Sequence, residues 1–212
     1  MTILIFVRHG KALTNQLGIL NNQDEGFPLT DEGRTAVART AIELKKIKIA
    51  HLYSSNILRA RQTAEIIGKA VGAKPTIDRR LKDREFGEML NMPVKDGEWL
   101  FDVDWDNTSV ETAGSIEKRM ASFIDMASGK GGVVVAVSHE DEIKSAVLMI
   151  LGLNYRDFSF GIKITNARMT VVSATGKRNQ LLAVNYTVLT GWLVSQIKKA
   201  ASVPRANKPT RA

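Results

Sequence analysis

The chain alternates between short, continuously apolar runs and longer stretches in which apolar residues recur every three or four positions. A continuous apolar run is typical of a strand covered on both faces of a sheet, and the longer spacing is typical of a helix with one buried face. Thr30 is expected to cap one helix, and Gly72 is expected to end another. The pattern predicts strands at 3–7, 51–55, 133–137, 161–165, 169–173 and 181–188, and helices at 30–48, 57–71, 109–128 and 143–151.

The order of these elements indicates the fold class. Strands that alternate with helices are typical of an α/β domain, and the run of strands near the C-terminus suggests that some strands are antiparallel. We expect a three-layer α/β/α sandwich around a mostly parallel, mixed central sheet. Residues 1–190 are predicted to form this single domain, and residues 191–212 a basic C-terminal extension that is partly disordered. The loop 88–107, with Trp99 and Trp105, either shapes the mouth of a pocket or packs against the domain.

The charge balance bears on the partners. The 212 residues carry a net charge of +8, of which the acid-free segment 192–212 holds +5 and the remaining residues +3. A nucleic-acid interface on the folded part is therefore not expected, although a nucleic-acid binder acting through the tail stays open. A domain that leans positive suits an anionic substrate. The sequence leaves open whether the chain forms a homodimer.

The apolar runs also bear on location. Neither of the longest runs approaches the ~20 residues that cross a bilayer, so no membrane partner is expected. The first residues lack a basic region before their apolar run and lack a small-residue cleavage site, which predicts a buried strand and not a secretory signal. We expect a cytoplasmic protein.

The residues available for chemistry are few. The chain has no cysteine, which excludes disulfides, thiolate nucleophiles and cysteine-based metal sites. Its only histidines are His9, His51 and His139, and no pair of them has the spacing of a helical zinc site. A metal site is therefore not expected.

Two of the three histidines occupy equivalent places. His9 follows the apolar run 3–7, and His139 follows the run 133–137. In open α/β sheets, ligands bind beyond the carboxyl ends of the strands, so neighbouring strands would bring both imidazoles to one pocket. Arg8 precedes the first histidine, and Arg59 falls in the first turn of a predicted helix, where backbone N–H groups favour anions. The pattern predicts an anion-binding site.

Several motifs then occur in a recognisable order between about residues 4 and 175. They are Arg8-His9-Gly10, then Asn15, then Leu29-Thr30-Asp31-Glu32-Gly33-Arg34, then Tyr53-Ser54-Ser55 with Arg59-Ala60-Arg61-Gln62-Thr63-Ala64-Glu65, and finally Val137-Ser138-His139. Arg-His-Gly alone is a weak signal, but the whole set is specific. With these motifs the chain resembles the histidine phosphatase superfamily, also called the phosphoglycerate mutase-like superfamily.

The resemblance implies a reaction and a set of roles. His9 would be a nucleophile that forms a phosphohistidine, while Arg8, Asn15, Arg59 and His139 would bind the phosphoryl oxygens. A neutral imidazole can attack phosphorus without a metal, and forked guanidinium groups match phosphate oxygens. The resemblance therefore implies a phosphorylated small-molecule substrate, no cofactor and no metal.

A leaving alkoxide also needs a proton, and three carboxyl groups are candidates for its donor. Asp83 aligns with the acid of the family's segment after the second block, although it is shorter than the usual Glu. Glu140 directly follows the second histidine and ranks second, and Glu85 ranks third. A working acid should have a raised pKa.

Two departures from the family pattern affect the expected activity. Lys11-Ala12 replaces the usual acid or amide followed by Thr or Ser, and Glu140-Asp141 replaces the usual pair of glycines. The region 88–130 is short for a mutase insertion. The sequence therefore favours a metal-independent phosphomonoesterase. The alternatives are a phosphoglycerate mutase-type phosphoryl transfer and a non-catalytic phosphate-binding module.

Overall fold

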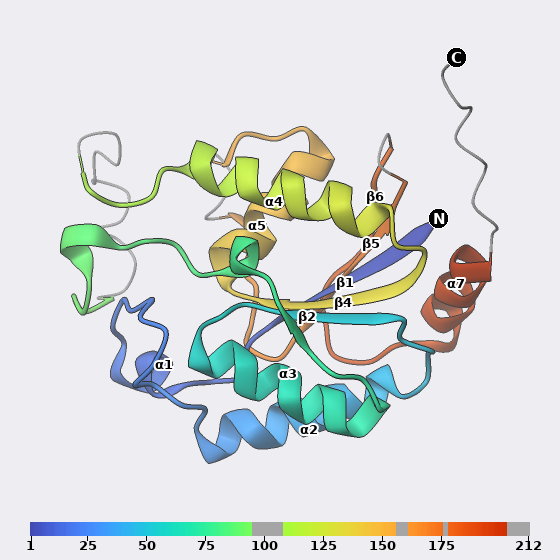
Figure 1. The fold of residues 1–212 in the computed structure, drawn as a ribbon, viewed down its shortest axis with the longest axis horizontal. Coiled ribbons are helices and arrows are strands. Elements are labelled where there is room, and N and C mark those ends of the chain that lie inside the picture. The colour runs from blue at the N-terminus through green and yellow to red at the C-terminus, as the bar shows by residue number, and fades with distance from the viewer. Residues whose placement is uncertain (95–107, 156–160, 176–177, 203–212) are drawn as a thin grey trace.

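The computed structural model describes residues 1–94, 108–155, 161–175 and 178–202. Within these residues, six strands form one sheet in the order β3-β2-β4-β1-β5-β6 (Figure 1). The pairings among β1, β2, β3 and β4 are parallel, whereas β5 is antiparallel to both β1 and β6. The strands are β1 (Thr2–Arg8), β2 (His51–Ser54), β3 (Thr76–Ile77), β4 (Gly132–Ser138), β5 (Met169–Ala174) and β6 (Gln180–Tyr186).

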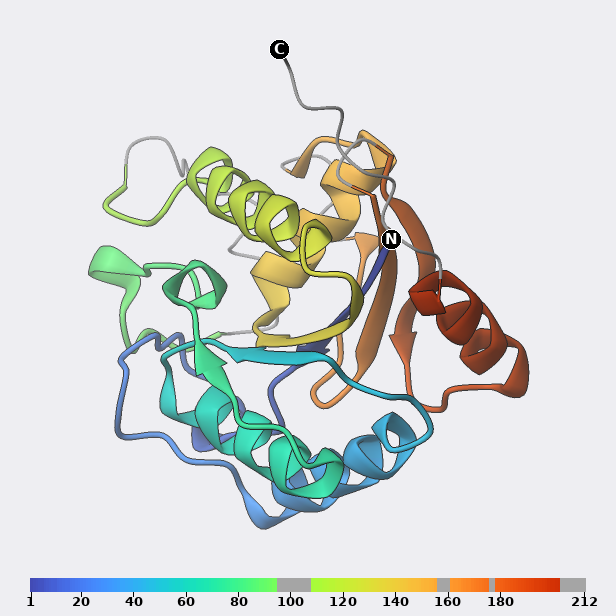
Figure 2. The same cartoon turned by 45° about the vertical axis from the view of Figure 1, so that its right-hand side comes forward.

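Helices cover both faces of this sheet. Figure 2 shows α2 and α3 on one side of it and α4 and α5 on the other. The α/β/α sandwich with a mostly parallel, mixed sheet is therefore confirmed. The helices are α1 (Leu13–Leu17), α2 (Asp31–Leu44), α3 (Leu58–Val71), α4 (Ala113–Ser128), α5 (Glu140–Leu151) and α7 (Gly191–Ser202), with 3-10 turns η1 (Arg79–Leu81) and η2 (Gly87–Met89).

The central strands are apolar throughout because both of their faces are buried. Successive side chains of a strand point to opposite faces. Ile3 and Ile5 accordingly join the core under α2, α3 and α7, whereas Leu4 and Phe6 join the core under α4 and α5. The continuous apolar run therefore predicted the correct environment for β1.

The ends of the helices follow their local chemistry. The Thr30 hydroxyl accepts a hydrogen bond from the Gly33 N–H at 3.0 Å and caps α2, as the sequence predicts. Gly72 ends α3 with a φ of 71°, in the left-handed region that favours glycine. Gly33 also allows a close approach, because a Cβ there would lie 2.1 Å from the Lys11 carbonyl oxygen. This contact holds the start of α2 against the loop that follows β1.

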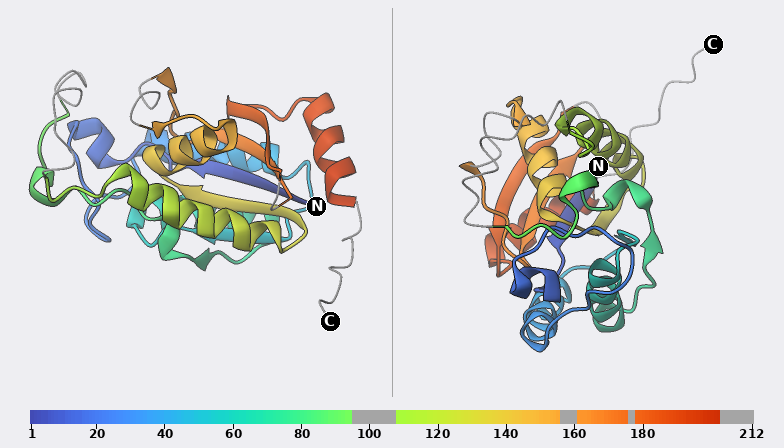
Figure 3. Two further views of the ribbon diagram at one scale, coloured as in Figure 1. Left: turned by 90° about the horizontal axis from the view of Figure 1, so that it is seen from above. Right: turned by 90° about the vertical axis from the view of Figure 1, so that its left-hand side faces the viewer.

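One prediction about the C-terminal part is wrong. Residues 161–165 form no strand, because the buried Ile164 gives its carbonyl oxygen to the Arg8 side chain and not to a neighbouring strand. Part of the predicted C-terminal extension packs against the domain, since Leu193 and Ile197 of α7 are buried in the main core. Figure 3 shows α7 beside the N-terminus, at the end of the sheet where β1 starts.

Some expectations fall on residues outside the described ranges. These are Trp99 and Trp105 in the loop 88–107 and the last ten residues of the predicted extension. Across the part of the chain that the structure does describe, no helix combines the length and the apolar character that a bilayer span requires.

Candidate active site

The carboxyl ends of β1 and β4 lie side by side, as the sequence predicts. The two strands pair in parallel along their whole length, so Arg8 is opposite Ser138. His9 follows directly after the first strand, and His139 follows the second as the N-cap residue of α5. The centroids of the two imidazole rings are 5.0 Å apart. Two histidines 130 positions apart in sequence therefore meet at one edge of the sheet.

The ring of His9 is held in one tautomer. Its Nδ1 lies 2.7 Å from the Gly10 carbonyl oxygen, and because a carbonyl oxygen only accepts, Nδ1 carries the proton. Its Nε2 accepts a hydrogen bond from Arg59 Nε at 3.2 Å. Burial, together with the positive charges of Arg59 and Arg8, holds the pKa of His9 well below its ordinary 6.5. The ring is therefore neutral at neutral pH, with an unprotonated nitrogen facing the arginine.

Arg59 is buried at the start of α3 and connects three parts of the site. Besides His9, its guanidinium donates to Asp83 Oδ2 at 2.5 Å and to the Asn21 carbonyl oxygen at 2.8 Å. Its side chain is only 2% exposed, so it is not a solvated surface charge. The Thr63 hydroxyl, one turn along α3, donates to the Arg59 carbonyl oxygen and accepts from the Gly10 N–H. The hydrogen bond from Gly10 to Thr63 fixes the segment directly after His9 against α3.

His139 is oriented by a serine, and its other ring nitrogen lies near a carboxyl group without a hydrogen bond to it. Its Nε2 lies 2.9 Å from Ser55 Oγ, which also accepts a hydrogen bond from the Ile57 N–H. The Ser55 hydroxyl can then donate to Nε2, which leaves the ring proton on Nδ1, 3.4 Å from Asp83 Oδ2. Burial, followed by the charges of Arg59 and its neighbours, holds the pKa of His139 well below 6.5.

Asp83 has surroundings that shift its pKa upward. Burial raises its pKa above the ordinary 3.8, and the nearby charge of Arg59 offsets only part of that rise. Its side chain is 15% exposed, so it retains access to solvent. It touches both Arg59 and His139, and the structure therefore brings this candidate acid into the cluster.

The other two candidate acids lie in different surroundings. Glu140 reaches Arg8 with one oxygen and Lys144 with the other, the second contact at 2.8 Å. A proton on either oxygen of Glu140 would therefore face a cation. Glu85 is exposed and pairs with Lys82 and with Asn22, away from the histidines.

Three buried N–H groups at this edge of the sheet indicate what kind of ligand could bind there. Arg8 Nε, Arg59 Nη1 and His139 Nδ1 are inaccessible to solvent, and none has a hydrogen-bond partner among the described residues. Buried polar groups are nearly always satisfied in folded proteins, so each exception calls for an explanation. Donors from three segments that gather around the His9 ring suit an anion with several oxygens.

Asn15 is less closely involved than the resemblance implies. Its side-chain oxygen accepts a hydrogen bond from the Ala12 N–H at the start of α1, and its side chain is exposed. Asn166 lies between it and the first histidine, because Asn166 Nδ2 donates to the His9 carbonyl oxygen at 3.0 Å and reaches Asn15 Oδ1 at 3.4 Å. Lys11 points elsewhere and pairs with Glu32.

Four residues that orient the site received no role from the sequence. Ser55 and Thr63 stand within motifs on which the resemblance to the family rests. The sequence therefore marked these two positions, but it did not show which groups their side chains bind. Asn21 and Asn166 contribute through a backbone oxygen and a side-chain amide in irregular segments, which no local pattern marks. These orienting residues are Asn21, Ser55, Thr63 and Asn166.

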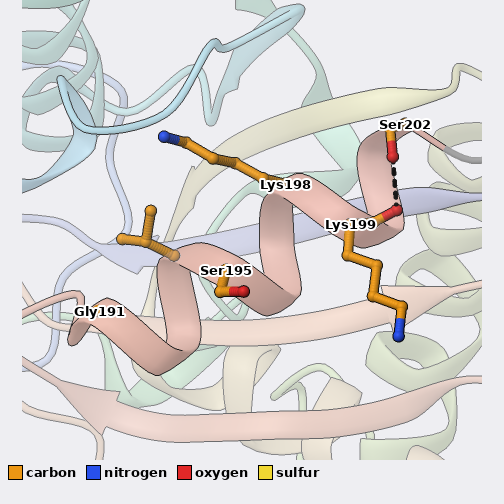
Figure 4. A pocket seen from close by; sticks show the side chains of 6 residues that line it. Gly191, Ser195, Lys198, Lys199 and Ser202 are labelled. Atoms are coloured by element: carbon orange, nitrogen blue, oxygen red, sulfur yellow. Dashed lines mark hydrogen bonds between the residues drawn. The ribbon is translucent and has the colours of Figure 1, made fainter.

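Two other features bear on a cofactor or a second ligand. Among the described residues, no group of three or more His, Cys, Asp or Glu side chains is arranged to hold a metal ion. An open hollow of about 630 Å³ runs along α7, where Lys198 and Lys199 extend from different sides of the helix (Figure 4). It contains none of the predicted site residues. Its lining is Gly191, Val194, Ser195, Lys198, Lys199 and Ser202.

Comparisons with known proteins identify the family. The family model described as the histidine phosphatase superfamily, branch 1, matches residues 4–187. The chain is 32% identical to a 2,3-bisphosphoglycerate-dependent phosphoglycerate mutase of Thermoplasma acidophilum over 183 residues, which is 81% of this chain and 87% of that protein.

Solved structures have the same fold. A mutant phosphoserine phosphatase of Entamoeba histolytica in complex with phosphoserine has a TM-score of 0.74 and 25% identity, covering 88% of this chain and 98% of that one. A mycobacterial glucosyl-3-phosphoglycerate phosphatase in complex with VO3 has a TM-score of 0.74 and 21% identity, covering 86% and 98%.

Proposed function

The chain belongs to the histidine phosphatase superfamily, and on this premise we propose that it is a metal-independent phosphomonoesterase that works through a phosphohistidine on His9. Its relatives include both phosphatases and mutases. The proposed substrate is a phosphorylated small molecule, and the proposed compartment is the cytoplasm. One observation carries the proposal, namely the neutral His9 ring with an unprotonated Nε2 among buried, unpartnered N–H donors.

The first step is the attack of His9 Nε2 on phosphorus. The lone pair of Nε2 forms the N–P bond while the bond between phosphorus and the ester oxygen breaks. Because Nδ1 already donates to the Gly10 carbonyl oxygen, the ring needs no base, and that bond stabilises the positive charge that develops on the imidazole. The lowered pKa of His9 keeps the nucleophile unprotonated at neutral pH.

The charge on the phosphoryl group in flight is spread over three oxygens. Arg8 and Arg59 would bind these oxygens with forked N–H groups, and His139 Nδ1 would add a third donor. Asn15 is assigned the same role through its amide. When phosphate binds, Arg59 Nε would turn from the lone pair of Nε2 to a phosphoryl oxygen, which frees the nucleophile.

Asp83 is proposed as the general acid. Its contacts with Arg59 and His139, together with the upward shift of its pKa, support this role, in which a protonated Asp83 would pass its proton to the leaving alkoxide. The resulting carboxylate would then take a proton from the water that attacks the phosphohistidine, so that the second step restores His9 and Asp83. Glu140 is the second choice because Arg8 and Lys144 already occupy its oxygens.

Hydrolysis of p-nitrophenyl phosphate, with and without a chelator, tests the proposal. We expect turnover that persists in EDTA and is lost in His9→Ala. The natural substrate would then be sought in a panel of sugar phosphates, phosphoglycerates, nucleotides and phosphoamino acids. Phosphate binding without turnover of any ester would favour the non-catalytic module.

A mutase activity is the second candidate, and the 32% identity to a 2,3-bisphosphoglycerate-dependent phosphoglycerate mutase favours it. A mutase must return the phosphoryl group to a bound product and keep water from the phosphohistidine. Incubation of 3-phosphoglycerate with 2,3-bisphosphoglycerate separates the two activities. A mutase yields 2-phosphoglycerate with little free phosphate, whereas a phosphatase releases phosphate as the main product.

A further inference from the structure

The first turn of α5 holds three consecutive acids, and each of them meets a different arginine. Glu140 pairs with Arg8, Asp141 with Arg84 Nε at 3.0 Å, and Glu142 with Arg119 Nη2 at 2.7 Å. A helix N-terminus favours acids, but that effect does not require burial. Glu142 is completely buried, and its Oε2 has no hydrogen-bond partner among the described residues. These carboxyl groups therefore do more than offset a helix dipole.

Arg119 on α4 connects several segments through its guanidinium group. Its Nε and Nη2 donate to the two oxygens of Glu111, and Nη2 also donates to Glu142 Oε1. Its Nη1 donates to the carbonyl oxygens of Arg80 and Lys82, both at 2.8 Å. All five N–H groups of the guanidinium thus have an acceptor. One side chain joins α4 and α5 to the backbone directly before Asp83.

Hydrogen bonds and an ion pair from other elements hold the residues on either side of Asp83. The Ser138 hydroxyl at the end of β4 donates to the Leu81 carbonyl oxygen at 2.8 Å. Arg119 holds the next carbonyl, that of Lys82, and Arg84 reaches back to Asp141. Residues 82–86 have no regular secondary structure, so their placement depends on these side-chain ties. The side chain left pointing at Arg59 and His139 is Asp83.

We propose that Asp141 and Glu142, acting through Arg84 and Arg119, are positioning residues that hold the Asp83 carboxyl group against Arg59 and His139. This inference rests on the proposed function, because the position of Asp83 matters to the reaction only if Asp83 is the general acid. It also gives a purpose to Asp141, which stands where the family usually has a glycine, because its partner Arg84 directly follows Asp83.

The charges around Asp83 are consistent with this role. Arg59 and Arg8 favour its ionised form, whereas burial and Asp141 oppose it. Burial and the proximity of Asp83 raise the pKa of Glu142 well above its ordinary value, whereas the charge of Arg119 lowers it. The Oε1 atom of Glu142 accepts the hydrogen bond from Arg119 Nη2. Glutamine has the same shape and the same acceptor, and leucine has a similar size without one.

The test compares an aryl phosphate, whose phenolate leaves without help, with an alkyl phosphate, whose alkoxide needs a proton. The Asp83→Asn variant is the reference, because it shows how much kcat/KM falls on each ester when the general acid is removed. We expect Glu142→Leu and Asp141→Asn to lower kcat/KM on the alkyl ester by on the order of tenfold or more, with about a twofold effect on the aryl ester. Glu142→Gln should retain near wild-type rates on both. Asp125→Asn, an exposed acid on α4, is the matched control and should change neither.

Combined variants distinguish positioning from general destabilisation. If Glu142 acts through Asp83, Glu142→Leu should cause almost no further loss in an Asp83→Asn background. Equal losses on both esters, or losses that simply multiply in the double variant, would overturn the inference. If Glu142→Leu does not fold, the same comparison with Asp141→Asn decides. The proposed function fails separately, when the wild-type chain releases no phosphate or His9→Ala remains active.

Discussion

Replacement of Arg59 by methionine perturbs the site at the point where most of its contacts meet. The substitution removes the guanidinium from His9 Nε2, from Asp83 Oδ2 and from the Asn21 carbonyl oxygen while it keeps a side chain of similar length. If Arg59 supplies phosphoryl contacts, the variant loses at least one transition-state donor. Loss of one such donor costs about 3 kcal/mol, which corresponds to a fall in kcat of about two orders of magnitude.

The same variant should lose stability, because Arg59 is buried. Breaking a buried ion pair on one side costs about 3–5 kcal/mol, since the remaining charge is left without compensation. Asp83 is partly exposed and its pKa is already raised, so it can take up a proton, and we expect a loss near 3 kcal/mol. The free energy of unfolding in urea measures this loss directly.

The pH dependence should shift in a defined direction. Burial lowers the pKa of His9 most, and the charge of Arg59 contributes the next largest effect. Without that charge the pKa of His9 rises, so the acidic limb of the kcat/KM profile should move to higher pH. Arg61→Met, two residues further along α3, is the control, because within the described ranges the Arg61 guanidinium binds Glu25 and the Asn56 carbonyl oxygen and not the histidines. An Arg59→Met protein with a rate within about threefold of wild type would refute the reasoning.

Other perturbations test individual contacts. Ser55→Ala should lower kcat about tenfold with little change in KM, because the His139 ring loses its partner at Nε2; steady-state kinetics decide. Gly33→Ala should lower the free energy of unfolding by about 1–3 kcal/mol in urea titrations, since a Cβ would meet the Lys11 carbonyl oxygen. The pKa of His139 is lower in the folded than in the unfolded chain, so its contribution to stability is complete above about pH 6.5 and lost as the pH falls below it. Urea midpoints should therefore fall less between about pH 7.5 and 5.5 in His139→Gln than in wild type, and equal slopes would contradict this. Vanadate should inhibit hydrolysis competitively, as a mimic of the trigonal-bipyramidal transition state, and noncompetitive inhibition would place it elsewhere.

The fold could be predicted where the local pattern of apolar and polar residues reflects which side chains are buried. The runs that became β1 and β4 are apolar because both faces of the sheet are covered, and the cap at Thr30 acts within three residues. The prediction at 161–165 failed because a buried carbonyl oxygen can serve a side chain as well as a strand, which the pattern of apolar residues does not distinguish.

The candidate site was predictable only for residues that adjoin a strand end or belong to a motif. His9, His139 and Arg59 met these conditions. The burial of Arg59, and its contacts with Asp83 and Asn21, depend on loops whose placement is set by tertiary packing. In the same way, no local pattern could show what the three acids after His139 bind, because their arginine partners come from three distant segments.

Trapping the covalent intermediate tests the central claim most directly. The protein would be mixed with its ester, quenched in base within the first turnover, digested, and examined by mass spectrometry. The account predicts one phosphoryl group on the peptide that contains His9, stable in base and lost in acid as expected for a phosphoramidate, and absent from His9→Ala. Steady turnover with no phosphoryl group on His9, or a phosphoryl group on another residue, would contradict it.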